Sequence, residues 1–208
     1  MGYISLMENS ITPIQEEKIK LRKKIKGIYK TLNKSEIAEK SKNILSNLKS
    51  LEIWNKADII LAFLPLSDEV DTSYIIEEAL TQKKKVAVPR INSSNIVFHY
   101  IASLSKKELV KHDYGMCEPL KESESVDINN LDNSKILILT PGMAFDKQCN
   151  RLGRGKSFYD RYLSEYGKNC TKAGIAFSFQ IIENLPIEKH DVQLDFVITD
   201  KEIFKRST

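Results

Sequence analysis

Cysteine is scarce in this chain, and its three cysteines, Cys117, Cys149 and Cys170, stand far apart. No CxxC pair occurs and the count is odd, so the sequence gives no support to a zinc site or a disulfide framework. A reducing, cytoplasmic setting is expected, because disulfides belong to oxidising compartments. We interpret each cysteine as a small core residue rather than as a nucleophile.

Long hydrophobic runs and a strong excess of charge are also missing. No apolar run approaches the roughly 20 residues that cross a membrane, and the opening MGYISLMENS lacks the pattern of a secretory signal. The net charge of +4 suits anionic ligands but is too small to indicate nucleic acid. We expect no membrane and no nucleic-acid partner, a flexible tail over residues 1–12 and one domain over residues 13–208.

Apolar residues recur with the periods of both helices and strands. Helical spacing predicts helices over residues 14–31, 71–84 and 157–167. It also predicts a helix that begins at a cap formed by Ser35. Short apolar runs predict strands at 57–65, 85–90, 96–101, 135–142, 172–177 and 195–200. The polar segment 114–134 is predicted to be a long functional loop. This alternation predicts an α/β layered fold with a mainly parallel sheet.

One short stretch, NRLGRGKSFYDRY at Asn150–Tyr162, concentrates cations and glycines. Gly153 and Gly155 allow a tight turn, and free backbone N–H groups in such a turn can hold phosphate oxygens. The cations beside them are Arg151, Arg154 and Lys156. Neither the Walker A pattern nor GxGxxG is present. The stretch is either an anion-binding loop or a basic turn on a solvated surface.

The residues that follow these cations allow two readings each. Asp160 is placed to bind magnesium beside phosphates, or to complement the dipole at a helix start. Phe158 and Tyr159 can stack on a planar ligand, or one of them can belong to the core.

Five further ionisable residues are candidates for the site. Lys18 and Arg22 share a helix face, from which they either reach a phosphate or meet solvent. Glu69 follows a predicted strand and either anchors a polar ring or only solubilises its loop. His190 and Asp191 form a pair without a nearby nucleophile, so a catalytic triad is not supported.

The segment TPGMAFDKQCNRLGRGKSFYDRYL resembles the signature of the 5-formyltetrahydrofolate cyclo-ligase family, PGxxFDxxGxRLGxGxGYYDRxL. The resemblance extends, in order, to KIKLRKKI, FLPLSDEVDT, VPR, YGMCEP and HDVQLDFVIT. It therefore covers nearly the whole chain.

This resemblance implies a fold and a reaction. The fold is a single three-layer Rossmann-like α/β/α domain, similar to the ribose-5-phosphate isomerase and CoA-transferase-like folds. The reaction converts 5-formyltetrahydrofolate and ATP, with Mg²⁺, into 5,10-methenyltetrahydrofolate, ADP and phosphate. The N5-formyl oxygen attacks the γ-phosphate, and N10 then closes the ring. A monomer that accepts polyglutamylated folate is expected.

The resemblance also implies a role for each matched residue. Arg154 and Lys156 are expected to stabilise the γ-phosphate as catalytic residues. The expected ATP contacts are Lys18, Arg22, Arg151, Leu152, Gly153, Arg154, Gly155, Lys156, Ser157, Phe158 and Tyr159. The expected folate contacts are Leu64, Glu69, Tyr114, Arg154 and Phe158. The expected metal ligands are Asp160 and, as a second contact, Asp191.

The chain departs from the family pattern at three places. Cys149–Asn150 replaces a glycine and a variable residue, Ser157 replaces a glycine, and Phe158 replaces a tyrosine. The Ser157 and Phe158 changes are the only support for an alternative, a non-catalytic protein that binds folate or nucleotide on the same scaffold. A sugar-phosphate isomerase or CoA transferase is a third possibility, suggested by analogy of fold alone.

Overall fold

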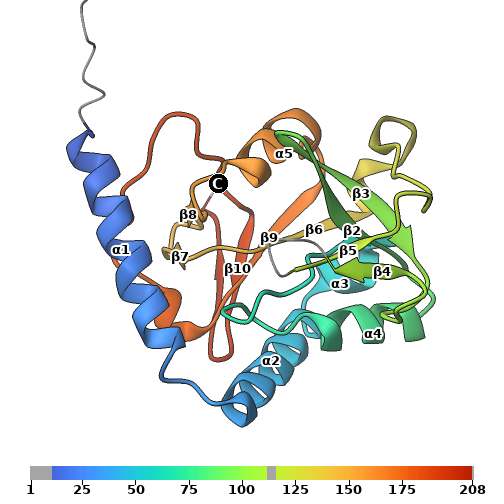
Figure 1. The fold of residues 1–208 in the computed structure, drawn as a ribbon, viewed down its shortest axis with the longest axis horizontal. Helices are drawn as coiled ribbons and strands as arrows, with labels where there is room; N and C mark the ends of the chain where they lie inside the picture. The colour runs from blue at the N-terminus through green and yellow to red at the C-terminus, as the bar shows by residue number, and fades with distance from the viewer. Residues whose placement is uncertain (1–10, 112–115, 208) are drawn as a thin grey trace, which may run out of the picture.

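The computed structural model describes residues 11–111 and 116–207. Their main feature is a seven-stranded sheet in the order β11-β10-β9-β6-β1-β2-β3 (Figure 1). Its strands are β1 (Ile59–Leu61), β2 (Lys85–Asn92), β3 (Asn95–Ile101), β6 (Ile136–Thr140), β9 (Thr171–Ile175), β10 (Phe196–Ile198) and β11 (Ile203–Lys205). The five inner strands pair in parallel, and only the edge strands β3 and β11 are antiparallel. The predicted mainly parallel sheet is confirmed.

The inner strands are apolar at successive positions because both faces of the sheet are covered. In β1, Ile60 belongs to one hydrophobic core, whereas Ile59 and Leu61 belong to the other. In β6, Leu137 and Leu139 face the first core, whereas Ile136 and Ile138 face the second. One uninterrupted apolar run therefore serves two cores.

The helices divide between these two faces, which gives three layers (Figure 1). They are α1 (Pro13–Tyr29), α2 (Lys34–Lys49), α3 (Glu52–Lys56), α4 (Ser73–Thr81) and α5 (Phe158–Tyr166). Helices α1 to α4 contribute Ile25, Ile44, Trp54 and Ile75 to the first core. Helix α5 contributes Leu163 to the second. Among the described residues, no helix is long and apolar enough to cross a membrane.

Two local predictions need correction. Helix α2 begins from Asn33 rather than Ser35, because Asn33 and Glu36 form a reciprocal capping box. The segment predicted as a loop carries strand β5 (Cys117–Pro119), which pairs with β4 (Leu109–Lys111). Part of that segment, including the expected folate contact Tyr114, lies outside the described residues, as does most of the expected tail. The three cysteines carry free thiols.

The connections define where a ligand site can form. The path from β1 through α4 to β2 uses one face of the sheet, and the path from β6 through α5 to β9 uses the other. Strands β1 and β6 are neighbours, so the connections diverge between them. In open α/β sheets, ligands bind beyond the carboxyl ends of the strands at such a switch point.

Candidate active site

A cavity of about 300 Å³ lies beyond the carboxyl ends of β1, β2 and β6. It collects most of the residues that the sequence proposed for the site. Those that line it are Leu64, Glu69, Arg151, Gly153, Arg154, Lys156, Ser157, Phe158, Tyr159 and Asp160. Leu64 and Glu69 follow β1. The others belong to residues 151–157, here called the glycine-rich segment, and to the first turn of α5. Two segments that are distant in sequence therefore form one site.

The glycine-rich segment owes its path to backbone geometry. It begins with β8 (Arg151–Leu152), which pairs with β7 (Ala144–Phe145) in a small hairpin. It ends where α5 begins. Gly155 has φ +100°, which favours glycine. Ser157 and Cys149 also have left-handed backbones, with φ +51° and +68°. Both departures from a family glycine thus fall where glycine would be least strained.

Arg151 is a buried cation that holds Asp160. Its Nη2 donates to Oδ1 of Asp160 at 2.6 Å, and its Nη1 donates to the carbonyl of Pro141 at 3.2 Å. The guanidinium also lies 5.8 Å from the ring centroid of Tyr159. Arg151 Nε and the Tyr159 hydroxyl are buried without a hydrogen-bond partner among the described residues. Such unsatisfied groups call for an additional partner such as water or a ligand.

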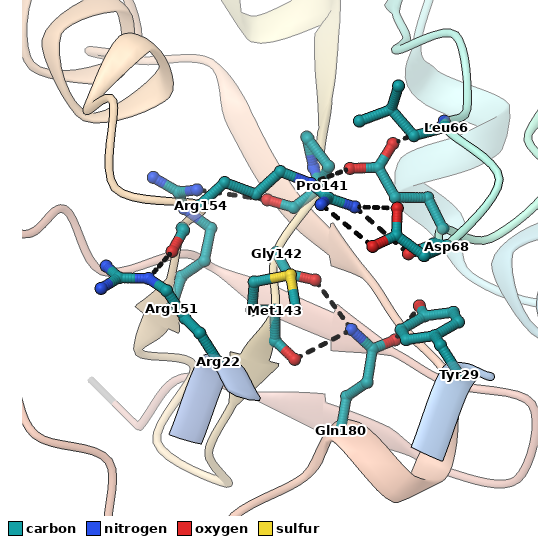
Figure 2. Close-up of polar contacts among 12 residues, drawn as sticks. Arg22, Tyr29, Leu66, Asp68, Pro141, Gly142, Met143, Arg151, Arg154 and Gln180 are labelled. Atoms are coloured by element: carbon teal, nitrogen blue, oxygen red, sulfur yellow. Dashed lines mark hydrogen bonds and ion pairs between the residues drawn. The ribbon is translucent and has the colours of Figure 1, made fainter. Parts of the chain in front are cut away.

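Arg154 joins the two halves of the cavity (Figure 2). Its Nε donates to Oε1 of Glu69 at 2.8 Å, and its two terminal nitrogens donate to the carboxylate of Asp68 at 2.7 and 3.2 Å. The other oxygen of Glu69 accepts from the backbone N–H of Leu66. Burial raises the pKa of Glu69, and the charge and hydrogen bond of Arg154 oppose that shift.

Helix α1 brings two cations to different places. Arg22 donates from Nε to the carbonyl of Gly153 at 2.8 Å, and so lies against the glycine-rich segment (Figure 2). Lys18 is only 5% exposed and pairs with Glu188 at 2.8 Å and Asp191 at 2.6 Å. Neither Lys18 nor Asp191 lines the cavity. Burial lowers the pKa of Lys18, but its hydrogen bonds to both carboxylates raise it by more.

Two polar residues that hold the lining of the cavity were missed by sequence reasoning. Asp68 stands beside Glu69 in a segment rich in acidic residues, and its partnership with Arg154 is not visible in the sequence. Gln180 is fully buried, and its Nε2 donates to the carbonyls of Gly142 and Met143 (Figure 2). Its Oε1 accepts from the Tyr29 hydroxyl at 2.9 Å. Gln180 thus ties α1 to the turn that follows β6, and its only sequence signal is a polar side chain within an apolar segment.

One acidic residue of the cavity, Asp160, suits a magnesium ion. No group of three or more potential ligands gathers within the described part of the chain. Magnesium commonly uses one or two carboxylates together with phosphate oxygens and water. Asp160 fits this chemistry because it lines the cavity and Arg151 fixes one of its oxygens.

The fold and the cavity define an α/β protein with a ligand cavity at the switch point of its sheet, lined by three cations and two carboxylates. A model of the 5-formyltetrahydrofolate cyclo-ligase family matches residues 14–200. The chain therefore belongs to that family.

Individual relatives agree with this assignment. The chain is 29% identical to the mouse 5-formyltetrahydrofolate cyclo-ligase, over 86% of this chain and 91% of the relative. Its structure is similar to the NMR structure of the Aquifex aeolicus 5,10-methenyltetrahydrofolate synthetase, with a TM-score of 0.77, 32% identity, and coverage of 92% and 95% of the two chains. For the structure of the 5,10-methenyltetrahydrofolate synthetase from Mycoplasma pneumoniae, the TM-score is 0.69 and the sequence identity is 26%. The match covers 89% of this chain and 99% of the other.

The family membership establishes the activity. The chain is an enzyme that forms 5,10-methenyltetrahydrofolate from 5-formyltetrahydrofolate, with ATP as co-substrate. The expected α/β fold and the expected conversion of 5-formyltetrahydrofolate to 5,10-methenyltetrahydrofolate are both confirmed.

Proposed function

We propose that the reaction proceeds by phosphorylation of the formyl group within the 300 Å³ cavity. The N5-formyl oxygen attacks the γ-phosphorus of ATP, so an O–P bond forms while the bond from that phosphorus to ADP breaks. N10 then attacks the activated formyl carbon, and the C–O bond to phosphate breaks. Loss of the N10 proton leaves the methenyl bridge, ADP and inorganic phosphate.

The residues of the cavity divide between the two substrates. Glu69 and Leu64 hold the pterin, with Phe158 and Tyr114 as further folate contacts. Arg154 and Lys156 neutralise the charge that develops on the transferred phosphoryl group. The remaining ATP contacts are Lys18, Arg22, Arg151, Leu152, Gly153, Gly155, Ser157 and Tyr159. Arg154 is shared, because it already bonds Glu69 at one end of the cavity.

Magnesium completes the proposed site. The ion would be held by Asp160, with Asp191 as a second contact, and would neutralise charge on the phosphates of ATP. Arg151 keeps Asp160 at the cavity wall. Asp191 starts from its ion pair with Lys18. In this proposal Lys18 contacts the nucleotide and also pairs with Asp191.

The meeting of Glu69 with the cation Arg154 carries this assignment. A carboxylate suited to a pterin and a cation suited to a phosphate lie 2.8 Å apart, in one cavity with two unsatisfied buried donors. This arrangement supports direct transfer between the two substrates. We also propose that the protein is a cytoplasmic monomer that accepts polyglutamylated folate. The free thiols fit a reducing compartment.

An isotope experiment tests the proposed path. The enzyme is supplied with ATP, Mg²⁺ and folate carrying ¹⁸O in the formyl group, and the products are analysed by mass spectrometry. The proposal expects one ¹⁸O atom in each inorganic phosphate. Release of ¹⁸O as water would show that the formyl oxygen does not attack phosphorus. Variants Arg154→Gln and Lys156→Gln are expected to lower kcat far more than Lys168→Gln, an exposed control.

A further inference from the structure

A second cavity, of about 670 Å³, adjoins the active site. It lies between the β2–β3 turn, the segment 125–129 and helix α5. Ile96 and Phe158 line both cavities, so these two apolar side chains form the boundary between them. A ligand that occupies both cavities would have to pass over this edge.

Arg161 supplies a cation to this second cavity. Its Nε donates to the side-chain oxygen of Asn95 at 3.2 Å, and its Nη2 donates to the carbonyl of Ser94. Its guanidinium lies 5.4 Å from the ring centroid of Phe158. Both hydrogen-bond partners are neutral, and within the described ranges no carboxylate lies at ion-pair distance from Arg161. Its positive charge is not neutralised there.

The two carboxylates that line this cavity have other partners. Asp127 accepts from the amide of Asn130 at 2.7 Å. Glu165 hydrogen-bonds Tyr166, and this bond raises the pKa of the tyrosine. Both acids keep their negative charge, and Arg161 is the one cation among the described residues that line this cavity, so it is the group that an anion entering past Phe158 would pair with.

The folate is too large for the active-site cavity alone, and this mismatch indicates which anion reaches Arg161. Ligand cavities usually measure roughly 300–1,000 Å³, so the active-site cavity of about 300 Å³ is small for its task. It must hold the pterin and the formyl group together with the terminal phosphate of ATP. The rest of the folate, an aromatic ring that ends in a glutamate, has to leave this space.

We infer that the second cavity receives the p-aminobenzoylglutamate part of the folate, and that Arg161 binds the α-carboxylate of its first glutamate. This assignment rests on the proposed function. The benzoyl ring crosses the edge formed by Ile96 and Phe158, where both neighbours are apolar. Further γ-linked glutamates extend along the polar walls of the cavity. Arg161 is thus a residue that sets the preference for the substrate tail.

A pair of substrates isolates this contact. Steady-state KM values are measured for 5-formyltetrahydrofolate and for 5-formyltetrahydropteroate, which lacks the glutamate. Arg161→Gln is expected to raise the KM for the folate roughly three- to tenfold, as for a partly solvated charged contact. The KM for the pteroate is expected to change far less. Lys168→Gln removes the same charge from an exposed residue outside the cavity and should alter neither KM.

Equal changes in both KM values, or none, would overturn the assignment. Wild-type enzyme supplies a second measurement that does not depend on the folding of a variant. Added salt should raise the KM for the folate more than the KM for the pteroate, since only the folate carries the α-carboxylate. Identical salt dependence contradicts the proposal. Absence of methenyl product from either substrate with wild-type enzyme would instead contradict the reaction itself.

Discussion

Arg154 and Glu69 form an ion pair across the active-site cavity, with Nε and Oε1 2.8 Å apart. The residues come from segments 85 positions apart in the chain. The cation proposed for the phosphate and the carboxylate proposed for the pterin are therefore partners before either substrate binds. In the proposed mechanism, binding of the pterin by Glu69 weakens this pair and frees the Nε of Arg154 for the phosphate.

The ion pair predicts a pH dependence for folate binding. Burial raises the pKa of Glu69 above its ordinary 4.5, so the carboxyl is protonated at a higher pH than in the unfolded chain. The KM for folate should rise as the pH falls through this raised pKa. Glu69→Gln should raise the KM roughly tenfold or more at neutral pH, as for a lost charged hydrogen bond, and should flatten the profile.

Measuring the free energy of unfolding against pH separates this effect on the folate KM from acid unfolding. The folded protein takes up the proton on Glu69 first, so this group increases the free energy of unfolding as the pH falls toward 4.5. That contribution is lost as the pH rises through the raised pKa. A folate KM that follows the same pH profile in Glu69→Gln and in wild type would exclude Glu69 as its origin.

Lys18 and Arg22 should respond differently to loss of their charges. Lys18→Met leaves Glu188 and Asp191 close together without their cation, so it should lower the free energy of unfolding by about 2 kcal/mol, below the full cost for a buried pair because both acids are partly solvated. Arg22→Gln should lower it by less than about 0.5 kcal/mol and raise the KM for ATP. Denaturant unfolding and ATP kinetics on both variants make the comparison. Equal destabilisation would contradict it.

Elements formed by local pattern could be predicted from the sequence. The inner strands and α1 were found because their apolar periods are local properties of the chain. The glycine-rich segment was found because its cations and glycines lie within a few residues of one another. Its family resemblance then supplied roles for residues such as Glu69, which the pattern alone had left open.

Relationships between distant segments could not be predicted in this way. The contact of Arg154 with Asp68 joins two loops, and the burial of Lys18 depends on how α1 packs against residues 188–191. The pattern favoured a solvated Lys18 because charged helix faces usually meet solvent. Asn33 rather than Ser35 caps α2, since both residue types are good caps and only the backbone path selects one.

Ser157→Gly should stabilise the protein slightly. Ser157 has φ +51°, a conformation that costs a non-glycine residue roughly 1–2 kcal/mol, while glycine loses more backbone entropy on folding. The net gain is expected to be about 0.5 kcal/mol. Cys149→Gly, at φ +68°, is the matched variant, but Cys149 is fully buried and its loss opens the core. Thermal unfolding should show opposite signs for the two variants, and a destabilised Ser157→Gly would contradict the strain argument.

Phe158→Tyr should restore a hydroxyl at the edge shared by the two cavities. If that hydroxyl bonds the folate, the KM for folate falls by a factor equivalent to about 0.5–1.5 kcal/mol, the net value of an ordinary hydrogen bond. The KM for ATP serves as the internal control. An unchanged folate KM would show that the family tyrosine acts through its ring alone.

Asp160→Asn distinguishes a metal ligand from a residue that only complements the start of α5. Both roles predict a loss of stability, because the variant removes the 2.6 Å ion pair of the buried Arg151 and a favourable charge at a helix N-terminus. Only the metal role predicts that the Mg²⁺ concentration for half-maximal activity rises, by about tenfold or more if a carboxylate ligand is lost. The measurement is a Mg²⁺ titration of the initial rate at saturating ATP, with Asp191→Asn in parallel. Asp191 accepts hydrogen bonds from Lys18 and from the backbone of Glu188, so its variant should show the smaller rise. An unaltered Mg²⁺ requirement in Asp160→Asn would assign Asp160 to the ion pair and the helix start alone.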